Sequence, residues 1–255
     1  MKLITGLFMA WGNFLTLPCP LKKWDNDLKN YMLGFLPSVG LIIGVLWALA
    51  AIALVLLGAP FLVMSFVMTF VLFVTCGFMH LDGFMDCSDA IMSRKPIEIK
   101  QQILKDSHCG AFAVVSVVFM LLAYFSFIST AISGAMDFVD LIILPVLSRS
   151  IAGIFVIWAK PIGHSQYAEG LGAEDKSQKK KASVLIAVQV ALASAVCLIL
   201  AADIIPTLMV MGCTIVGTTV AILYAKKSLG GMSGDIAGYG IVWGELIGIF
   251  GMLIL

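Results

Sequence analysis

Charged residues are scarce in this sequence. Lysine, arginine, aspartate and glutamate together make up 12% of its 255 residues, whereas about 25% is usual in a soluble domain. Hydrophobic residues make up 61%, and the mean hydropathy is +1.06. This composition excludes an ordinary soluble domain. It predicts an all-α, polytopic integral membrane protein, with residues 1–255 forming one membrane domain.

A strong net charge and paired cysteines are lacking as well. The formal net charge is +1 and no basic amphipathic tail is present, so nucleic acid is not expected as a partner. None of the six cysteines stands in a C-x-x-C pair, which argues against a disulfide framework and against a zinc site. We expect all six to be reduced: Cys19, Cys76, Cys87, Cys109, Cys197 and Cys213.

Long apolar runs fill most of the chain, and each is close to the ~20 residues that span a bilayer. The runs predict seven transmembrane helices, at about residues 31–57, 61–79, 110–132, 139–160, 183–202, 205–224 and 237–255. Residues 1–20 carry an apolar helical stripe that ends at Pro18 and Pro20. We expect this stripe to form a retained interfacial helix.

The loops between the runs alternate sharply in charge. Apart from Arg149, every lysine and arginine is either Lys2 or lies in one set of loops, residues 22–30, 80–109, 160–182 and 225–236. The other set, residues 58–60, 133–138 and 203–204, holds no lysine or arginine. The positive-inside rule therefore predicts cytoplasmic charged loops, a cytoplasmic N-terminus and an outer C-terminus. Because the long loops share one side, we expect the active site at the cytoplasmic face.

One of these charged loops concentrates carboxylates. Asp82, Asp86 and Asp89 are spaced i, i+4, i+7 and would share one face of a helix. Like charges on one face repel each other, and a hard divalent cation would relieve that repulsion. Oxygen ligands favour Mg²⁺ or Mn²⁺ over zinc. Gly83, which lies between Asp82 and Asp86, could let a ligand approach the backbone closely. The alternative is a helix cap with a solvated face. His80, just before the acids, could be a ligand, a proton carrier, a phosphate contact or a structural hydrogen-bonding group.

Two further groups of residues could carry chemistry. Asp106 and Ser107 lie where the same loop re-enters the membrane, and could bind metal or phosphate or could cap the next helix. Arg149 lies inside an apolar run, at a cost of roughly 2.5–3.5 kcal/mol. It could clamp a phosphate or carboxylate of the substrate, or form an ion pair with Glu245.

Two glycine-rich loops complete the candidate site. Residues 161–172 contain Glu169-Gly-Leu-Gly172 and precede a lysine run, residues 179–181, that is typical of a membrane anchor. Residues 230–240 contain Gly234 and Asp235. Their glycines could cradle phosphate or allow tight helix packing, and Asp235 could be an additional ligand of the metal or the substrate.

The two acidic motifs together resemble the cobalamin synthase family, the adenosylcobinamide-GDP ribazoletransferases. The resemblance lies in His80-Leu-Asp82-Gly83-x2-Asp86-x2-Asp89-Ala90 and in Asp106-Ser107-x2-Gly110-Ala-Phe. Further matches run in order along the chain: Phe14-Leu-Thr-Leu-Pro18, Phe35-Leu-Pro37-Ser-Val-Gly40, Ser148-Arg149, Glu169-Gly-Leu-Gly172 and Gly230-Gly-Met-Ser-Gly234-Asp235. One departure is Leu17, which stands where the family commonly has a basic residue, so no role of that residue is carried over.

The resemblance implies a reaction and a location. The ribose hydroxyl of α-ribazole, or of α-ribazole 5′-phosphate, attacks the phosphate on the cobinamide arm of adenosylcobinamide-GDP. GMP leaves, and adenosylcobalamin or its 5′-phosphate forms. Mg²⁺ is the implied cofactor, and the location is a prokaryotic cytoplasmic (inner) membrane, with the lipid bilayer as a partner. The resemblance leaves the oligomeric state open, a homo-oligomer included.

The expected site follows from the residues and the resemblance together. We expect Asp82, Asp86 and Asp89 to be catalytic and to hold the metal, with Asp106 as a further ligand or as the base. The expected contacts to the substrate are the following residues: His80, Ser107, Arg149, Gly234 and Asp235.

Two other functions compete with this interpretation. A CDP-alcohol phosphotransferase also clusters aspartates at helix ends, but its DG-x2-AR pattern is not met after Asp82-Gly83. A cation-coupled transporter would place ionisable groups near the bilayer midplane. Here only Arg149, Asp140 and Glu245 fall within the apolar runs.

Overall fold

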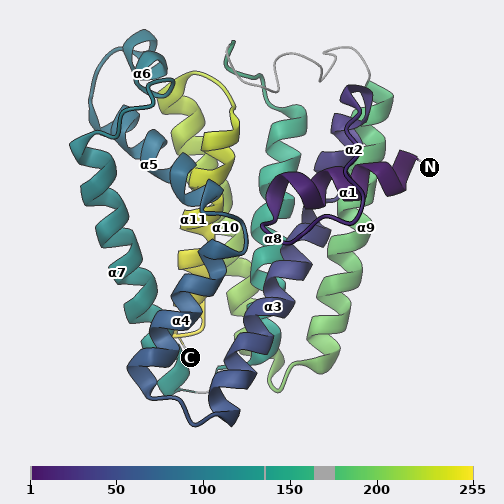
Figure 1. The fold of residues 1–255 in the computed structure, drawn as a ribbon, viewed down its shortest axis with the longest axis vertical. Coiled ribbons are helices and arrows are strands. Elements are labelled where there is room, and N and C mark those ends of the chain that lie inside the picture. Colours follow the sequence, from purple (N-terminus) through teal and green to yellow (C-terminus); the bar gives the residue numbers. More distant parts are fainter. Residues whose placement is uncertain (1, 135, 164–175, 255) are drawn as a thin grey trace.

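The structure, a computed structural model, is built from helices. It describes residues 2–134, 136–163 and 176–254, and in this part of the chain there are eleven α-helices, one short 3-10 helix and no β-strand (Figure 1). The α-helices are α1 Lys2–Phe14, α2 Lys29–Gly34, α3 Leu36–Leu56, α4 Phe61–Val74, α5 Met79–Met92, α6 Ile97–Ile103, α7 Ala111–Ser133, α8 Phe138–Trp158, α9 Lys176–Leu200, α10 Ile204–Leu229 and α11 Gly234–Gly251. The predicted all-α class is confirmed.

Several helices are suited to cross a membrane. α3, α7, α8, α9 and α10 are long and apolar enough, which makes five, and the bent pair of α4 and α5 would make a sixth. α11 runs beside α10 along the bundle (Figure 1), but it is less apolar because it contains six glycines in addition to Asp235 and Glu245. The chain is therefore a multi-pass membrane protein, whereas the expected number of seven crossings stays a prediction.

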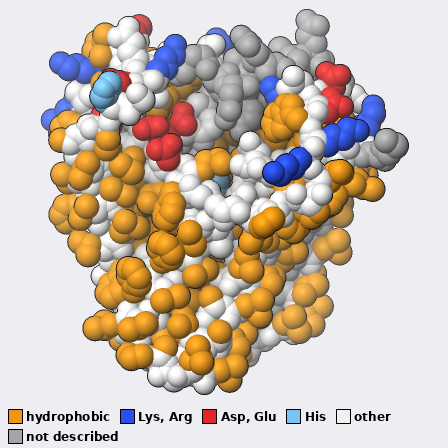
Figure 2. All heavy atoms as spheres, viewed as in Figure 1, with side chains coloured by type: hydrophobic (Ala, Val, Ile, Leu, Met, Phe, Trp, Pro, Cys, Tyr) orange, Lys and Arg blue, Asp and Glu red, His pale blue; other side chains and the backbone are white. Residues whose placement is uncertain are grey.

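Charged side chains gather at one end of the bundle. Figure 2 shows lysine, arginine, aspartate and glutamate side chains at this end, and mostly hydrophobic side chains over the rest of the visible surface. We call this end the charged face. It carries α5, α6, the segment of residues 104–110 and the loop of residues 230–233 (Figure 1). The alternation of the loops predicted such a face, and which side of the membrane it occupies stays a prediction.

A sharp bend turns α5 across the charged face. α4 ends at Val74, and α5 leaves it at 85° after a break in which Gly77 and Phe78 have φ of 61° and 60°. Thr16 satisfies the backbone at the break, since its N–H donates to the Thr75 carbonyl (3.0 Å) and its hydroxyl to the Val74 carbonyl (3.1 Å). The transmembrane helix expected at about residues 61–79 therefore ends at Val74, because a distant segment completes the hydrogen bonds that the bend frees.

The N-terminal helix is too short to cross the bilayer. α1 has 13 residues, about 20 Å of helix, whereas the hydrocarbon core is about 30 Å thick. It packs on α2, where a Cβ added to Gly6 would lie 2.8 Å from Cβ of Tyr31. These observations agree with an interfacial helix, which stays a prediction.

Small residues allow the central helices to pack closely. In α3, a Cβ added to Gly44 would lie 2.7 Å from the Ile142 backbone of α8. In α11, Gly240, Gly244 and Gly248 lie four residues apart and face Ile222, Thr218 and Thr214 of α10. This small-xxx-small spacing is typical of close helix contacts in membranes. Tight packing, one of the two interpretations offered for the glycines after Asp235, is thus what the structure shows for Gly240.

Candidate functional site

Three carboxylates lie along one face of α5. Asp82 is exposed, and Asp86 and Asp89 are half-buried. The residues between them that face the bundle, such as Phe84 and Cys87, are buried at 2% and 0% exposure. α5 is helical from Met79 to Met92, so the prediction that the three acids share a helical face is confirmed. We call Asp82, Asp86 and Asp89 the acidic row.

The acidic row carries negative charge that neighbouring cations do not balance. Partial burial, and then the charges of Asp82, Asp235 and Asp89, raise the pKa of Asp86 from 3.8 to about 7. In the described part of the chain, no ion pair joins a residue of the row to a lysine or arginine. A site with this electrostatic field attracts a cation or a substrate that carries one.

Asp235 joins the row through a close helix contact. A Cβ added to Gly83 of α5 would lie 2.8 Å from Cα of Asp235 and 2.9 Å from its carbonyl oxygen. Ser233 is the N-cap of α11, and its hydroxyl also lies 3.2 Å from Oδ2 of Asp235. Gly83 was expected to let a ligand approach the backbone, but the backbone that approaches is that of α11. Because Gly83 lacks a side chain, α11 packs close enough to bring a fourth carboxylate, that of Asp235, to the site.

The side chain of Asp89, a residue of α5, lies against the start of α7. Its carboxylate lies against Gly110, the N-cap residue of α7, and a Cβ at position 110 would overlap the carboxylate oxygens. The positive end of a helix dipole favours a carboxylate at this place. Asp89 therefore connects the acidic row to the point where the chain re-enters the bundle.

Asp106 and Ser107 lie on the exposed segment before α7. Asp106 accepts hydrogen bonds from the backbone N–H of His108 (3.0 Å) and pairs with its ring Nδ1 (2.6 Å). These bonds lower the pKa of Asp106 and raise that of His108. The N-cap of α7 is Gly110, so the alternative in which Asp106 or Ser107 caps this helix was wrong. The carboxylates that act on Asp86 are those of Asp82, Asp235 and Asp89, with Asp106 turned to His108 instead.

The two glycine-rich loops meet beside Asp235. The N–H of Ile162 donates to the carbonyl of Met232, and the N–H of Met232 donates to the carbonyl of Lys160, both at 2.9 Å. Gln101 of α6 donates to the carbonyl of Leu229 (2.8 Å). These bonds fix the loop of residues 230–233 before α11. The Glu169–Gly172 motif of the first loop lies outside the described residues.

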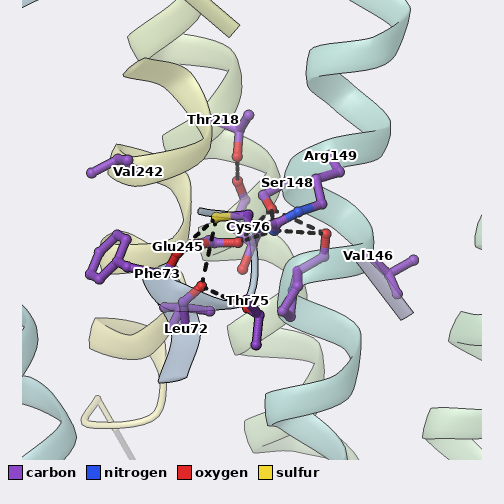
Figure 3. Close-up of polar contacts among 12 residues, drawn as sticks. Leu72, Phe73, Thr75, Cys76, Val146, Ser148, Arg149, Thr218, Val242 and Glu245 are labelled. Atoms are coloured by element: carbon purple, nitrogen blue, oxygen red, sulfur yellow. Dashed lines mark hydrogen bonds and ion pairs between the residues drawn. The ribbon is translucent and has the colours of Figure 1, made fainter. Parts of the chain in front are cut away.

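Arg149 and Glu245 form a buried ion pair (Figure 3). Their side chains are 1% and 2% exposed, and Nη1 of Arg149 also donates to the Ser148 hydroxyl (3.2 Å) and the Pro145 carbonyl (3.3 Å). The Ser148 hydroxyl donates to Oε1 of Glu245 (3.0 Å). Of the two interpretations of Arg149, the structure shows the ion pair, which joins α8 to α11.

His80 lies on the other side of α5 from the acidic row. It precedes Asp82 by two residues, which places the two side chains roughly 160° apart around the helix. His80 is 6% exposed, and its Nε2 has no hydrogen-bond partner in the described part of the chain. A built Cβ on Gly238 of α11 would lie 3.0 Å from its carbonyl oxygen. The structure therefore places His80 in the contact between α5 and α11.

The acidic row suits Mg²⁺ in its chemistry, but it does not form a closed cage. Among the described residues, no group of three histidine, cysteine, aspartate or glutamate side chains converges tightly enough to hold a metal by itself. Mg²⁺ usually keeps several waters and is bound by one or two carboxylates together with substrate phosphates. Clustered carboxylates, among which burial and then like charge raise the pKa of Asp86, offer that kind of partial ligand set.

The family model and the curated relatives that match this chain belong to one enzyme family. The family model described as cobalamin-5-phosphate synthase matches residues 6–253. An adenosylcobinamide-GDP ribazoletransferase of Clostridium perfringens is 36% identical over 245 residues, which is 94% of each chain. One of Clostridium botulinum is 34% identical over 255 residues, 98% of this chain and 97% of the relative. One of a Geobacillus species is 30% identical and covers 93% of this chain and 91% of its own. No solved structure matches.

Proposed function

We propose an active site for this chain, which belongs to the cobalamin-5-phosphate synthase family. Its activity is that of an adenosylcobinamide-GDP ribazoletransferase, a transferase that acts in assembling the nucleotide loop of cobalamin. The substrates implied are adenosylcobinamide-GDP and α-ribazole or its 5′-phosphate. We place the reaction at the acidic row of α5. One observation supports this place above all: burial and the charges of three neighbouring carboxylates raise the pKa of Asp86 to about 7, and no lysine or arginine of the described chain pairs with the row.

Asp82, Asp86 and Asp89 would hold Mg²⁺ in this proposal. Bound Mg²⁺ would neutralise charge on the diphosphate and on the departing GMP. Asp235, held at the row by Gly83 and Ser233, would complete the negative wall. A site that lacks a full set of protein ligands leaves positions for the phosphate oxygens of the donor.

The remaining residues would bind and orient the substrates. The N-terminus of α11 at Gly234 and Asp235 favours a phosphate, and Ser107 lies on the exposed segment before α7. Arg149 and His80 are buried, so we assign them roles in positioning α5, α8 and α11. In the proposed transfer, the ribose hydroxyl gives its proton to a carboxylate and its oxygen bonds to phosphorus. The bond from that phosphorus to the oxygen of the departing GMP breaks. Asp106 is our candidate for the carboxylate that takes the proton.

The proposed placement in the membrane follows from the loops. The charged face, with α1 as an interfacial helix, would lie on the cytoplasmic side of the inner membrane, with the C-terminus on the outer side. Both water-soluble substrates would then reach the acidic row from the cytoplasm.

The decisive test is the variant Asp82→Asn, compared with Asp25→Asn as a control. Asp25 is also an acid on a polar loop, but it lies outside the proposed site and caps the short 3-10 helix. GMP release from adenosylcobinamide-GDP, measured with α-ribazole in reconstituted vesicles, should fall by roughly 100-fold for Asp82→Asn and change little for Asp25→Asn. A folded Asp82→Asn protein with full Mg²⁺-dependent activity would contradict the proposed site.

A further inference from the structure

We propose that this enzyme binds an anionic phospholipid, with one acyl chain inserted behind α5 and the headgroup at Lys227. The proposal rests on a pocket between α5, α7, α10 and α11, which we call the lateral pocket. It has a volume of about 540 Å³, within the range of roughly 300–1,000 Å³ that is typical of ligand sites. It is separate from the acidic row, so its failure would leave the proposed active site standing.

The lateral pocket has a buried floor and a mouth on the lipid-facing surface. Its floor is formed by Phe84, Met120 and Tyr239, which are 2%, 3% and 8% exposed. Its mouth is formed by Phe119 of α7 and Tyr224 of α10, which are 69% and 54% exposed. Both belong to helices that are long and apolar enough to span the membrane. The pocket therefore opens sideways, toward the hydrocarbon of the bilayer.

α5 itself separates the pocket from the proposed active site. Phe84, Ser88 and Ile91 line the pocket. Each follows an acid of the row by two residues and therefore lies roughly 200° around the helix from it. Because a helix with its side chains is about 10 Å across, a phosphate of α-ribazole 5′-phosphate bound at the acidic row does not place the rest of that small substrate in this pocket.

The two serine hydroxyls of the lining already have partners and do not call for a polar ligand. The Ser88 hydroxyl donates to the Phe84 carbonyl (2.7 Å), and the Ser116 hydroxyl lies 3.3 Å from the sulfur of Met92. Phe84 stacks on Tyr239 with 5.5 Å between ring centroids, and Trp243 meets both rings edge-on. A hydrocarbon chain satisfies such walls through apolar burial alone.

Charge beside the mouth selects an anionic headgroup. Lys227 follows Tyr224 by three residues, so its exposed side chain lies on the same side of α10, one turn closer to the charged face. Lys226 follows Tyr224 by two residues and points away, roughly 200° around the helix. Lysines at the ends of membrane helices reach the headgroup layer and attract anionic lipids. A lipid whose phosphate lies at Lys227 has its acyl chains at the height of the pocket.

Trp243 allows the acyl chain to be detected directly. The full chain is reconstituted in vesicles that contain equal amounts of phosphatidylglycerol and phosphatidylcholine, with brominated acyl chains on one lipid or on the other. Quenching of Trp243 is obtained by subtracting the signal of the Trp243→Phe variant. We expect it to be roughly five-fold more sensitive to bromine on phosphatidylglycerol, the preference that one lysine near a membrane surface supplies.

Matched variants separate a bound chain from bulk lipid. Lys227→Gln should abolish the preference for phosphatidylglycerol, and Lys226→Gln should keep it. Ala123→Phe, which fills the pocket from α7, should remove the quenching by both lipids. Val118→Phe, on the exposed surface of α7 outside the pocket, should not. Equal quenching by both lipids in the unchanged chain, no quenching at all, or loss of quenching when α-ribazole is added would each overturn the proposal.

Discussion

The acidic row and the Arg149–Glu245 pair show two ways in which this membrane protein holds charge. Arg149 and Glu245 are almost fully buried, and each has the other as its partner, with Ser148 between them. The acidic row lies on the charged face beside a further carboxylate, and its charges repel one another. Charge that the protein balances itself joins helices, and charge that it leaves unbalanced is available to a ligand.

The largest expected effect is on the balanced pair. Glu245→Gln leaves the Arg149 guanidinium buried without a counter-charge, and the free energy of unfolding should fall by about 3–5 kcal/mol. Unfolding in mixed micelles by a denaturing detergent measures this change. The double variant Arg149→Met with Glu245→Met serves as the control, because replacing both charges by apolar groups should recover most of the loss. A stable Glu245→Gln protein beside an unstable double variant would contradict the structural role.

The unbalanced row should respond in the opposite direction. Asp86→Asn removes one of several mutually repelling carboxylates, so the free energy of unfolding should rise, by about 1 kcal/mol because solvent screens a half-exposed group. Transfer activity should nevertheless fall roughly 100-fold, because a ligand of the proposed metal site is lost. Thermal unfolding with a chelator present and GMP release with Mg²⁺ present measure the two effects. If stability and activity fell together, the row would be a structural feature like the buried pair.

The same contrast explains what could be predicted from the sequence. The i, i+4, i+7 spacing of Asp82, Asp86 and Asp89 places them on one helical face whatever surrounds the helix, so local geometry was sufficient. The charged face followed from loop composition for a similar reason. The ion pair of Arg149 could be offered only as an alternative, because Glu245 lies 96 residues away in the chain and only the packing of α8 against α11 decides between the two roles.

Contacts between distant segments account for the remaining differences. The break after Val74 depends on hydrogen bonds from Thr16, and no pattern within residues 61–79 reveals that partner. Gly83 was expected to let a ligand approach the backbone, but its close neighbour is the backbone of Asp235. The lateral pocket is lined by residues of four helices that lie far apart in the chain, so no single segment carries a signature of it.

The smallest expected effect is on Asp106 and His108. This pair is exposed, unlike the buried pair of Arg149 and Glu245, and its charges are matched, unlike those of the acidic row. The hydrogen bonds from His108 lower the pKa of Asp106, and the bond to Asp106 raises the pKa of His108. The raised pKa of His108 stabilises the folded segment at low pH, and this contribution is lost as the pH rises through that pKa. The lowered pKa of Asp106 acts in the other direction and is lost as the pH falls through it. The ion pair therefore forms only at pH values between the pKa of Asp106 and the pKa of His108.

Asp106→Asn should return the pKa of His108 toward its ordinary 6.5 while the thermal midpoint stays unchanged, since an exposed pair adds little stability. Nuclear magnetic resonance of labelled histidines measures the pKa, with the buried His80 as an internal reference. If Asp106 takes the proton of the ribose hydroxyl, the same variant loses transfer activity and its loss is greatest at low pH, where hydroxide cannot substitute for the carboxylate. Unchanged activity at every pH would remove Asp106 from the site and leave the unbalanced charge of the acidic row, with Asp235, as the source of the catalytic base.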